Sequence, residues 1–294
     1  MRILVIGGTR LLGRHIAQTA LDRGHDVTVF NRGQTDPGAL PEATRLTGDR
    51  DTDLIALSSG EWDATIDVCA YVPGQVRSLL ESLGARAGHY TFVSTISVYS
   101  EDVVDSGFTE AAALLEPEWS DERQVAKYGE LKVACEQVAA DLTGGRLLII
   151  RPGYVIGPYD YTERFTHWIR EVAAGKPFDA PAAEQPLQCI DGRDLAAFTI
   201  GCVEREVLDV FNVTAPQSPP TFAEALATIA LGLGVELPEV RYADPSYDSE
   251  ELPLSAAPSW WPLMRASVSR ATAAGLRWRP LEETVRDTAA FADV

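Results

Sequence analysis

Tyr128 and Lys132, four residues apart, are the pair in this sequence best suited to proton transfer. A helix is predicted over about residues 124–142, and the i, i+4 spacing places both side chains on one face of it. An ammonium near a phenol favours the phenolate and lowers a pKa that is ordinarily about 10. Such a tyrosine can exchange a proton with a substrate oxygen. The alternative interpretation is an ordinary surface pair.

Hydroxyl groups follow the strand predicted over residues 90–94. Ser94, Thr95 and Ser97 stand where the carboxyl end of a parallel strand opens into a ligand crevice. A hydroxyl there can hold the reacting oxygen near Tyr128. The alternative for each of the three is a hydrogen bond to its own backbone at the strand end.

The element that would position a cofactor beside these groups is the N-terminal segment. An apolar strand over residues 3–6 runs into a glycine turn, and an amphipathic helix follows. A strand, turn and helix of this kind bind the pyrophosphate of a dinucleotide with the N–H groups at the helix start. An ordinary strand–helix turn is the alternative. The expected contacts in this loop are Gly7, Thr9, Arg10, Leu11, Leu12 and Gly13.

The end of the second predicted strand bears on the choice between NAD and NADP. An NAD site usually has a carboxylate here for the ribose 2′-OH, but this strand ends in Asn31 and Arg32. Arg32 and Arg10, which replaces a glycine of the usual pattern, could hold a 2′-phosphate from two sides. We therefore expect NADP, with NAD as the alternative. The competing interpretation is that both arginines are solvated loop residues.

Composition excludes several classes of protein. The chain has 294 residues and a formal charge of −18, which argues against binding a nucleic-acid backbone. No apolar run reaches the roughly 20 residues that cross a bilayer, and the N-terminus lacks the layout of a signal peptide, so we expect a cytoplasmic protein without a membrane partner. The four cysteines and four histidines are scattered, so we expect reduced thiols and no metal site. The arginine-rich, lysine-poor composition suggests a bacterial source.

Apolar strands alternate with helical segments through the first half of the sequence, and a long polar loop is expected from Glu101 to Asp121. This alternation predicts an α/β protein with a doubly wound parallel sheet of the Rossmann kind. The second half is less regular and rich in prolines and aromatics, which indicates a smaller, discontinuous C-terminal substrate-binding cap. The nucleotide domain would comprise residues 1–156 and about 189–211. The cap and C-terminal region would comprise about 157–188 and 212–294.

The ordered motifs of the chain resemble the short-chain dehydrogenase/reductase superfamily. They are closest to its extended branch of NAD(P)-dependent epimerases, dehydratases and reductases, and the Gly-Gly-Thr-Arg turn resembles a divergent subgroup of that branch. The motifs that carry the resemblance are the glycine turn, Gly48-Asp49, Ser94-Thr95-x-x-Val98-Tyr99, Tyr128-x-x-x-Lys132 and Arg151-Pro152-Gly153-x-x-x-Gly157-Pro158.

The resemblance implies roles for the matching residues. Thr95 would be the catalytic hydroxyl, Tyr128 the acid/base, and Lys132 its partner and a ligand of the nicotinamide ribose. Asp49 would accept a hydrogen bond from the adenine amine. Besides the glycine loop, the implied cofactor contacts are Asn31, Arg32, Asp49, Arg50, Cys69, Ala70, Tyr71, Ser94, Tyr128, Lys132, Pro152 and Gly153.

The substrate side of the crevice is less specified. An arginine there could bind a phosphate or a carboxylate. Arg193 stands between Asp191 and Asp194, so a structural ion-pair cluster is the favoured alternative for it. The candidate substrate residues are Tyr154, Arg164, Trp168, Gln188 and Arg193.

Three functions remain open at this point. The first is an NADP-dependent carbonyl reductase that acts on a small molecule through Thr95, Tyr128 and Lys132. The second is an NAD-dependent sugar-nucleotide epimerase or dehydratase that retains its cofactor. The third is a non-catalytic nucleotide-binding regulator or RNA-associated protein. The resemblance also implies a homodimer.

Overall fold

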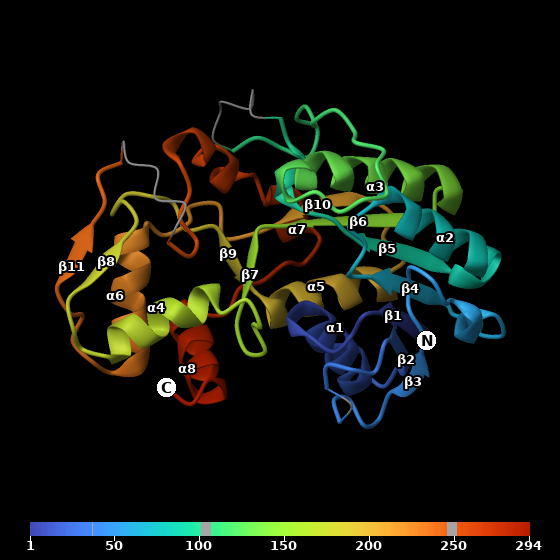
Figure 1. Cartoon of the computed structure of the whole chain (residues 1–294), viewed down its shortest axis with the longest axis horizontal. Coiled ribbons are helices and arrows are strands. Elements are labelled where there is room, and N and C mark those ends of the chain that lie inside the picture. Colours follow the sequence, from blue (N-terminus) through green and yellow to red (C-terminus); the bar gives the residue numbers. More distant parts are fainter. Residues whose placement is uncertain (37, 101–106, 246–251) are drawn as a thin grey trace.

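The computed structural model describes residues 1–36, 38–100, 107–245 and 252–294. Its centre is a seven-stranded parallel sheet in the order β10-β6-β5-β4-β1-β2-β3 (Figure 1). The expected doubly wound α/β sheet is therefore confirmed. Its strands are β1 (Arg2–Ile6), β2 (Asp26–Asn31), β3 (Thr44–Thr47), β4 (Ala64–Asp67), β5 (His89–Val93), β6 (Leu147–Pro152) and β10 (Val210–Val213).

Helices cover both faces of this sheet. Helices α1 (Leu11–Asp22) and α5 (Gly192–Glu204) pack together on one face, and α2 (Pro73–Leu83) and α3 (Tyr128–Thr143) on the other. Successive strand residues point to opposite faces. In β1, Ile3 therefore joins the core under α1 and α5, whereas Leu4 joins the core under α2 and α3. An uninterrupted apolar run is what a strand with two covered faces requires.

A second, smaller unit lies at the other end of the molecule (Figure 1). Its core brings together Trp168, Phe222 and Val285, which are far apart in the sequence. The cap is thus discontinuous, as expected. Its elements are α4 (Arg164–Ala173), α6 (Phe222–Leu233), α8 (Leu281–Phe291) and the paired strands β8 (Phe178–Ala180) and β11 (Val240–Tyr242), and the paired strands β7 (Tyr154–Ile156) and β9 (Cys189–Asp191) lie between the two units.

Some boundaries differ from the expected ones. The division expected at residues 211–212 falls inside β10, and α7 (Ser269–Ala273) packs against that strand rather than in the cap core. The helix expected from residue 124 begins with a short 3₁₀ turn, and α3 itself starts at Tyr128. Of the loop expected from Glu101 to Asp121, residues 101–106 lie outside the described ranges. Within those ranges, no helix is long and apolar enough to cross a membrane.

Candidate active site

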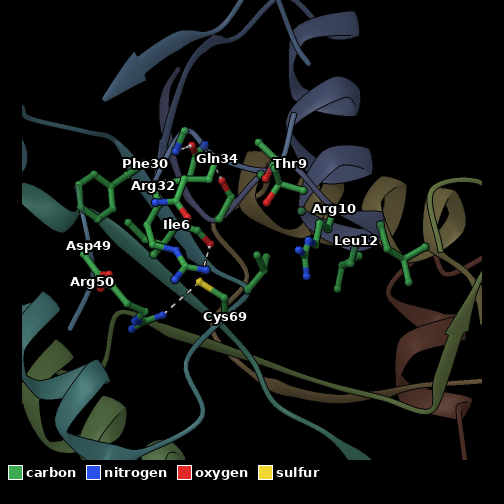
Figure 2. A pocket seen from close by; sticks show the side chains of 18 of the residues that line it. Ile6, Thr9, Arg10, Leu12, Phe30, Arg32, Gln34, Asp49, Arg50 and Cys69 are labelled. Atoms are coloured by element: carbon green, nitrogen blue, oxygen red, sulfur yellow. Dashed lines mark hydrogen bonds between the residues drawn. The ribbon is translucent and has the colours of Figure 1, made fainter. Parts of the chain in front are cut away.

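A pocket of about 490 Å³ lies at the carboxyl ends of β1, β2 and β4 (Figure 2). Its floor is the loop between β1 and α1, where Gly7 and Gly8 have φ values of +111° and +88°. A Cβ on Gly13 would lie 2.7 Å from the Gly8 nitrogen, so the helix can approach the loop this closely only without a side chain there. This shape fits a dinucleotide pyrophosphate at the start of α1. The expected contacts that line the pocket are Gly7, Thr9, Arg10, Leu11, Leu12, Gly13, Asn31, Arg32, Asp49, Arg50, Cys69 and Tyr71.

The two arginines expected to hold a 2′-phosphate do not converge on one point. Arg32 follows β2 and is exposed, and its guanidinium has no partner among the described residues. Arg10 precedes α1, and its guanidinium stacks on the ring of Tyr161, 4.7 Å from the ring centre. The two arginines therefore do not form the expected 2′-phosphate site, because Arg10 is held against the cap. Tyr161 lines the pocket, and sequence reasoning missed it.

Asn31 and Asp49 serve the backbone around the pocket. The Asn31 amide donates to the carbonyl of Gly7 at 3.1 Å and accepts from the N–H of Gly33 at 2.8 Å. The Asp49 carboxylate accepts from the N–H of Asp51 at 2.9 Å, and this side chain still lines the pocket. Both residues therefore hold the loops at the adenosine end in place.

Arg50 is buried beneath the pocket. Its guanidinium donates to both carboxylate oxygens of Asp67, at 2.7 and 3.0 Å, and to the carbonyl of Gln75 at 3.0 Å. The Tyr90 hydroxyl donates to the same carboxylate at 3.0 Å. Arg50 was expected to contact the cofactor, but most of its donors are used by Asp67 and Gln75. Its main role in this structure is to fix the end of β4 under the pocket.

A loop of the cap, residues 157–163, contacts the start of α1, and we call it the roof loop. The Tyr159 carbonyl accepts from the N–H of Leu11 at 3.3 Å, and the Arg14 guanidinium stacks 3.9 Å from the centre of the Tyr159 ring. The same ring lies 4.6 Å from that of Phe291 at the end of α8. The roof loop thus ties the nucleotide-binding helix to the cap.

Tyr128 is the first residue of α3 and is 36% exposed. It lies near Thr95, whose Oγ1 donates to Ser97 Oγ at 3.2 Å and accepts from the N–H of Ser97 at 3.1 Å. Burial raises the pKa of Tyr128, while the neighbouring Thr95 hydroxyl and the charge of Arg164 act to lower it. The structure therefore brings Thr95 and Tyr128 together, but the expected lowering of the tyrosine pKa does not occur.

Lys132 is buried, with 3% of its surface exposed. Its ammonium donates to the carbonyls of Ala70 and Val93, at 2.9 and 2.7 Å, and lies 4.1 Å from the centre of the Phe92 ring. Burial lowers the pKa of Lys132 to about 8. The ammonium is therefore held by backbone carbonyls, and among the largest influences on the pKa of Tyr128 the cation is Arg164.

Four side-chain polar atoms are buried without a hydrogen-bond partner in the described part of the chain: Arg50 Nε, Ser94 Oγ, Thr143 Oγ1 and Gln188 Oε1. Of these, Ser94 Oγ and Gln188 Oε1 lie near the ends of β5 and β6. Ser94 follows β5. The Gln188 oxygen would lie 2.9 Å from a Cβ on Gly153, which follows the adjacent strand β6. Buried polar atoms are almost always satisfied, so the two atoms fit a ligand with polar groups. The other expected cofactor contacts at this edge, Ala70, Ser94, Pro152 and Gly153, are not among the residues that line the pocket.

The other candidate substrate residues fall into two groups. Tyr154 and Arg164 lie together at the crevice, with the guanidinium carbon 5.2 Å from the ring centre. Trp168 does not reach the crevice. It is 1% exposed, its indole N–H donates to the carbonyl of Pro253 at 3.0 Å, and its ring packs against Phe222 in the cap core. An aromatic on the inner face of an amphipathic helix is buried by that helix, which corrects the expectation for Trp168.

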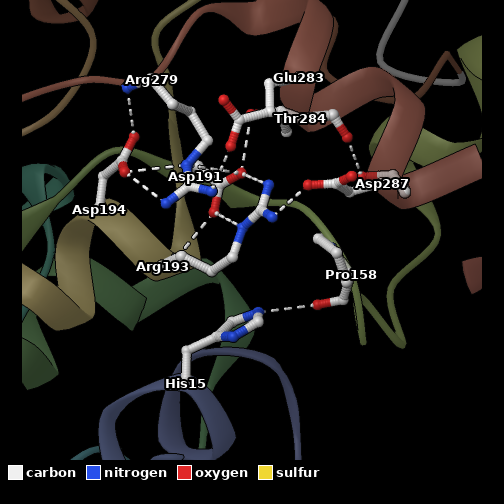
Figure 3. Close-up of polar contacts among 10 residues, drawn as sticks. His15, Pro158, Asp191, Arg193, Asp194, Arg279, Glu283, Thr284 and Asp287 are labelled. Carbon is white, nitrogen blue, oxygen red and sulfur yellow. Dashed lines mark hydrogen bonds and ion pairs between the residues drawn. The ribbon is translucent and has the colours of Figure 1, made fainter. Parts of the chain in front are cut away.

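Arg193 belongs to a network of charges where α5 meets α8 (Figure 3). Its guanidinium donates to Asp191, at 2.9 and 2.7 Å, and also to Asp287. The Thr284 hydroxyl donates to Asp191 at 2.7 Å, and Arg279 pairs with Asp194 at 2.8 Å. Arg193 thus has the structural role that the neighbouring carboxylates favoured, and it holds the cap to the sheet. No group of three or more His, Cys, Asp or Glu in the described ranges is placed to hold a metal ion.

Three comparisons place the chain among known proteins. The model of the NAD dependent epimerase/dehydratase family matches residues 3–213. The UDP-N-acetylglucosamine 4-epimerase of Methanobrevibacter ruminantium M1 superposes with a TM-score of 0.77 at 17% identity, covering 99% of this chain and 98% of that one. The UDP-glucuronic acid 4-epimerase of Bacillus cereus, in complex with NAD, gives 0.73 at 16% identity, covering 100% and 99%. Likenesses at these identities show the fold alone.

A curated relative is also similar in sequence. It is the chloroplast stem-loop binding protein of 41 kDa b of Arabidopsis thaliana, 26% identical over 277 residues. The match covers 83% of this chain and 66% of the relative, so the chain spans slightly less than two thirds of that protein's length.

Proposed function

The chain belongs to the NAD dependent epimerase/dehydratase family, and on that premise we propose that it oxidises and re-reduces one small substrate on a nucleotide that it retains. An NADP-dependent carbonyl reductase was the first expectation from the sequence. The family and its solved neighbours favour the epimerase or dehydratase alternative instead. The observation that carries the proposal is the proximity of Thr95, which follows β5, and Tyr128, the first residue of α3, at the carboxyl edge of the sheet.

Retention of the nucleotide is supported by the roof loop. Its contacts with Leu11 and Arg14 tie the start of α1, where a pyrophosphate would lie, to the cap. A nucleotide in the pocket would leave only after these contacts between the roof loop and α1 have broken. A cofactor that is restored within each turnover does not have to leave, so such a closed site suits internal redox.

The chain's own residues divide the remaining work. When bound, NAD(P) supplies the acceptance and return of a hydride. Thr95 orients the substrate oxygen by a hydrogen bond, and Tyr128 moves the proton at that oxygen. Lys132 uses two of its three N–H donors on backbone carbonyls, which leaves one for a ribose hydroxyl. Ser94 Oγ and Gln188 Oε1 are the buried polar atoms that a ligand would satisfy.

We propose NADP as the preferred nucleotide, with NAD as the alternative. Arg32 alone now supports this choice, since Arg10 stacks on Tyr161. The neutral Asn31 leaves the end of β2 without a carboxylate that would repel a 2′-phosphate.

Nucleic-acid binding is a second candidate because the curated relative is named for binding a stem-loop. A formal charge of −18 opposes it, since binding to a phosphate backbone is driven by clustered positive charge. A stem-loop RNA that bound at physiological salt, and was not displaced by NAD(P), would favour this candidate over the enzyme.

The test is to identify the nucleotide that leaves the purified protein on denaturation, and then to titrate emptied protein with NADPH and NADH side by side. We expect a bound NAD(P) that exchanges slowly. Protein that purifies empty, and exchanges NADPH quickly while reducing a carbonyl compound, would return the reductase to first place. Protein that binds neither nucleotide would overturn the enzyme proposal.

A further inference from the structure

Arg164 lies beside Tyr154, which closely follows the end of β6. Arg164 is the first residue of α4 and is exposed. Its guanidinium lies over the ring of Tyr154, and its Nε donates to Thr162 Oγ1 at 3.2 Å. Tyr154 directly follows Gly153, one of the cofactor contacts that the resemblance implies. The charge of Arg164 also opposes the effect of burial on the pKa of Tyr128, so the guanidinium lies within electrostatic range of that hydroxyl.

No carboxylate neutralises this arginine in the described part of the chain. The contrast is Arg170 on the same helix, which pairs with both oxygens of Glu163 at 3.0 and 3.1 Å. The terminal amino groups of Arg164 have no partner among the described residues. A guanidinium that is held in place but uncompensated offers two parallel N–H donors, the arrangement that matches a carboxylate or a phosphate.

We propose that Arg164 is the anion-binding residue of the substrate crevice. The substrate then carries a carboxylate or a phosphate close to the carbon whose oxygen contacts Tyr128. This inference rests on the proposed function and adds the chemical class of the substrate to it. Arg164 also becomes a positioning residue, because an anion held beside Tyr154 sets which substrate oxygen reaches Tyr128.

The first test measures how fast phenylglyoxal modifies each arginine, by peptide mass spectrometry. The protein is first saturated with NADPH, so that Arg10, Arg32 and Arg123 in the nucleotide pocket are covered. Sodium phosphate, sodium acetate and sodium chloride are compared at equal ionic strength. We expect phosphate or acetate to slow the modification of Arg164 several-fold relative to chloride, and to leave Arg170 unchanged.

The two anions separate the two sources of the charge. Protection by acetate alone indicates a carboxylate substrate, and stronger protection by phosphate indicates a phosphorylated one. Equal rates in all three salts, or equal protection of Arg164 and Arg170, would overturn the proposal.

A second test uses Arg164→Gln, Arg164→Lys and the control Arg170→Gln. The groups that act on the pKa of Tyr128 or are coupled to it are Thr95 after β5, Tyr71 after β4, Cys135 on α3, Tyr161 on the roof loop and Arg164. Phenolate absorbance of each protein is titrated against its own Tyr128→Phe partner, which isolates this tyrosine. We expect a higher pKa in Arg164→Gln and a pKa near that of the parent protein in Arg164→Lys and Arg170→Gln.

An unchanged pKa in Arg164→Gln would contradict the placement of the charge beside the hydroxyl. The titration is run on nucleotide-free protein as well as on loaded protein. A failure to bind NAD(P) would therefore overturn the proposed function, but the pKa of Tyr128 in the Arg164 variants could still be measured.

Discussion

The crevice and the network between α5 and α8 use the same side chains in opposite ways. In the network, Arg193 and Arg279 are each paired with carboxylates, and the central acceptor, Asp191, is buried (Figure 3). Arg32 in the nucleotide pocket and Arg164 at the start of α4 have no carboxylate partner among the described residues, and Lys132 donates only to carbonyls.

The difference separates two functions of charge. A paired cation is compensated within the fold, so removing one partner destabilises the protein. An exposed cation without a partner in the fold is solvated and can gain a partner when a ligand binds. We therefore expect substitutions in the network to change stability without changing ligand binding, and substitutions of the exposed Arg32 and Arg164 to do the reverse.

The largest effect is expected for Tyr128→Phe at the crevice. Loss of the hydroxyl removes the proton transfer, and turnover should fall by about 10² to 10⁴-fold, the usual contribution of a general acid or base. NADPH affinity should stay within about twofold, since the ring remains. Tyr242→Phe on β11 in the cap is the control. Turnover that matches the parent protein would exclude Tyr128 from the mechanism.

In the network, Asp191→Asn should lower the free energy of unfolding by about 3 kcal/mol, because Arg193 is left without its main partner. Denaturant unfolding measures this, and NADPH affinity should not change. Arginine and hydrogen-bonding partners hold the pKa of Asp191 below its ordinary value, although burial acts against them. The difference between the two proteins should therefore shrink as the pH falls through the acid range, where Asp191 is protonated.

The control for that substitution is Asp179→Asn. Asp179 pairs with Arg241 at 2.7 Å, but both side chains are mostly exposed. Exposed pairs contribute little, so unfolding should be unchanged within error. Equal losses of unfolding free energy in Asp191→Asn and Asp179→Asn would contradict the comparison. Burial would then not explain the contribution of the network to stability.

At the adenosine end, Arg32→Ala should weaken NADPH about tenfold more than NADH, as expected for the loss of a charged hydrogen bond to a 2′-phosphate. Arg10→Ala is the matched variant, because Arg10 stacks on Tyr161 and should affect both nucleotides alike. Titration of both nucleotides with each variant measures this. Equal losses for NADPH and NADH in Arg32→Ala would remove the support for NADP.

The smallest effect concerns the buried ammonium of Lys132. Its pKa is about 8 in the folded protein and 10.5 ordinarily, so between these values the unfolded chain binds a proton that the folded chain does not. The unfolding free energy of the parent protein should therefore rise relative to Lys132→Met by about 1 kcal/mol per pH unit above pH 8. Lys127→Met, at an exposed position, should show no such trend. A flat difference between pH 8 and 10 would mean that Lys132 stays charged.

Local pattern was enough to predict the sheet and the loop between β1 and α1. The φ values of Gly7 and Gly8 and the close approach at Gly13 depend on neighbouring residues, so the sequence encodes them directly. The proximity of Thr95 and Tyr128 could also be predicted, because Thr95 follows a predicted strand and Tyr128 lies near the start of a predicted helix.

Contacts between distant segments were not predictable in the same way. Arg50 finds Asp67 on another strand, and Arg10 finds Tyr161 in the cap, so neither partner is visible from spacing. The i, i+4 rule predicted that Lys132 lies on the same helix face as Tyr128. It could not predict the position of the ammonium, which donates to the carbonyl of Val93 at the end of β5. For Trp168, residue type alone does not distinguish a pocket wall from a core.

The stack of Phe291 on Tyr159, and of Tyr159 under Arg14, also has a consequence for biosynthesis. Helix α1 is among the first elements to leave the ribosome, and α8 is the last helix in the described part of the chain. Almost the whole sequence must therefore be translated before the nucleotide-binding helix acquires its final neighbours. A nascent chain passes through translation with the start of α1 uncovered, and the pocket reaches its finished form only after synthesis of α8.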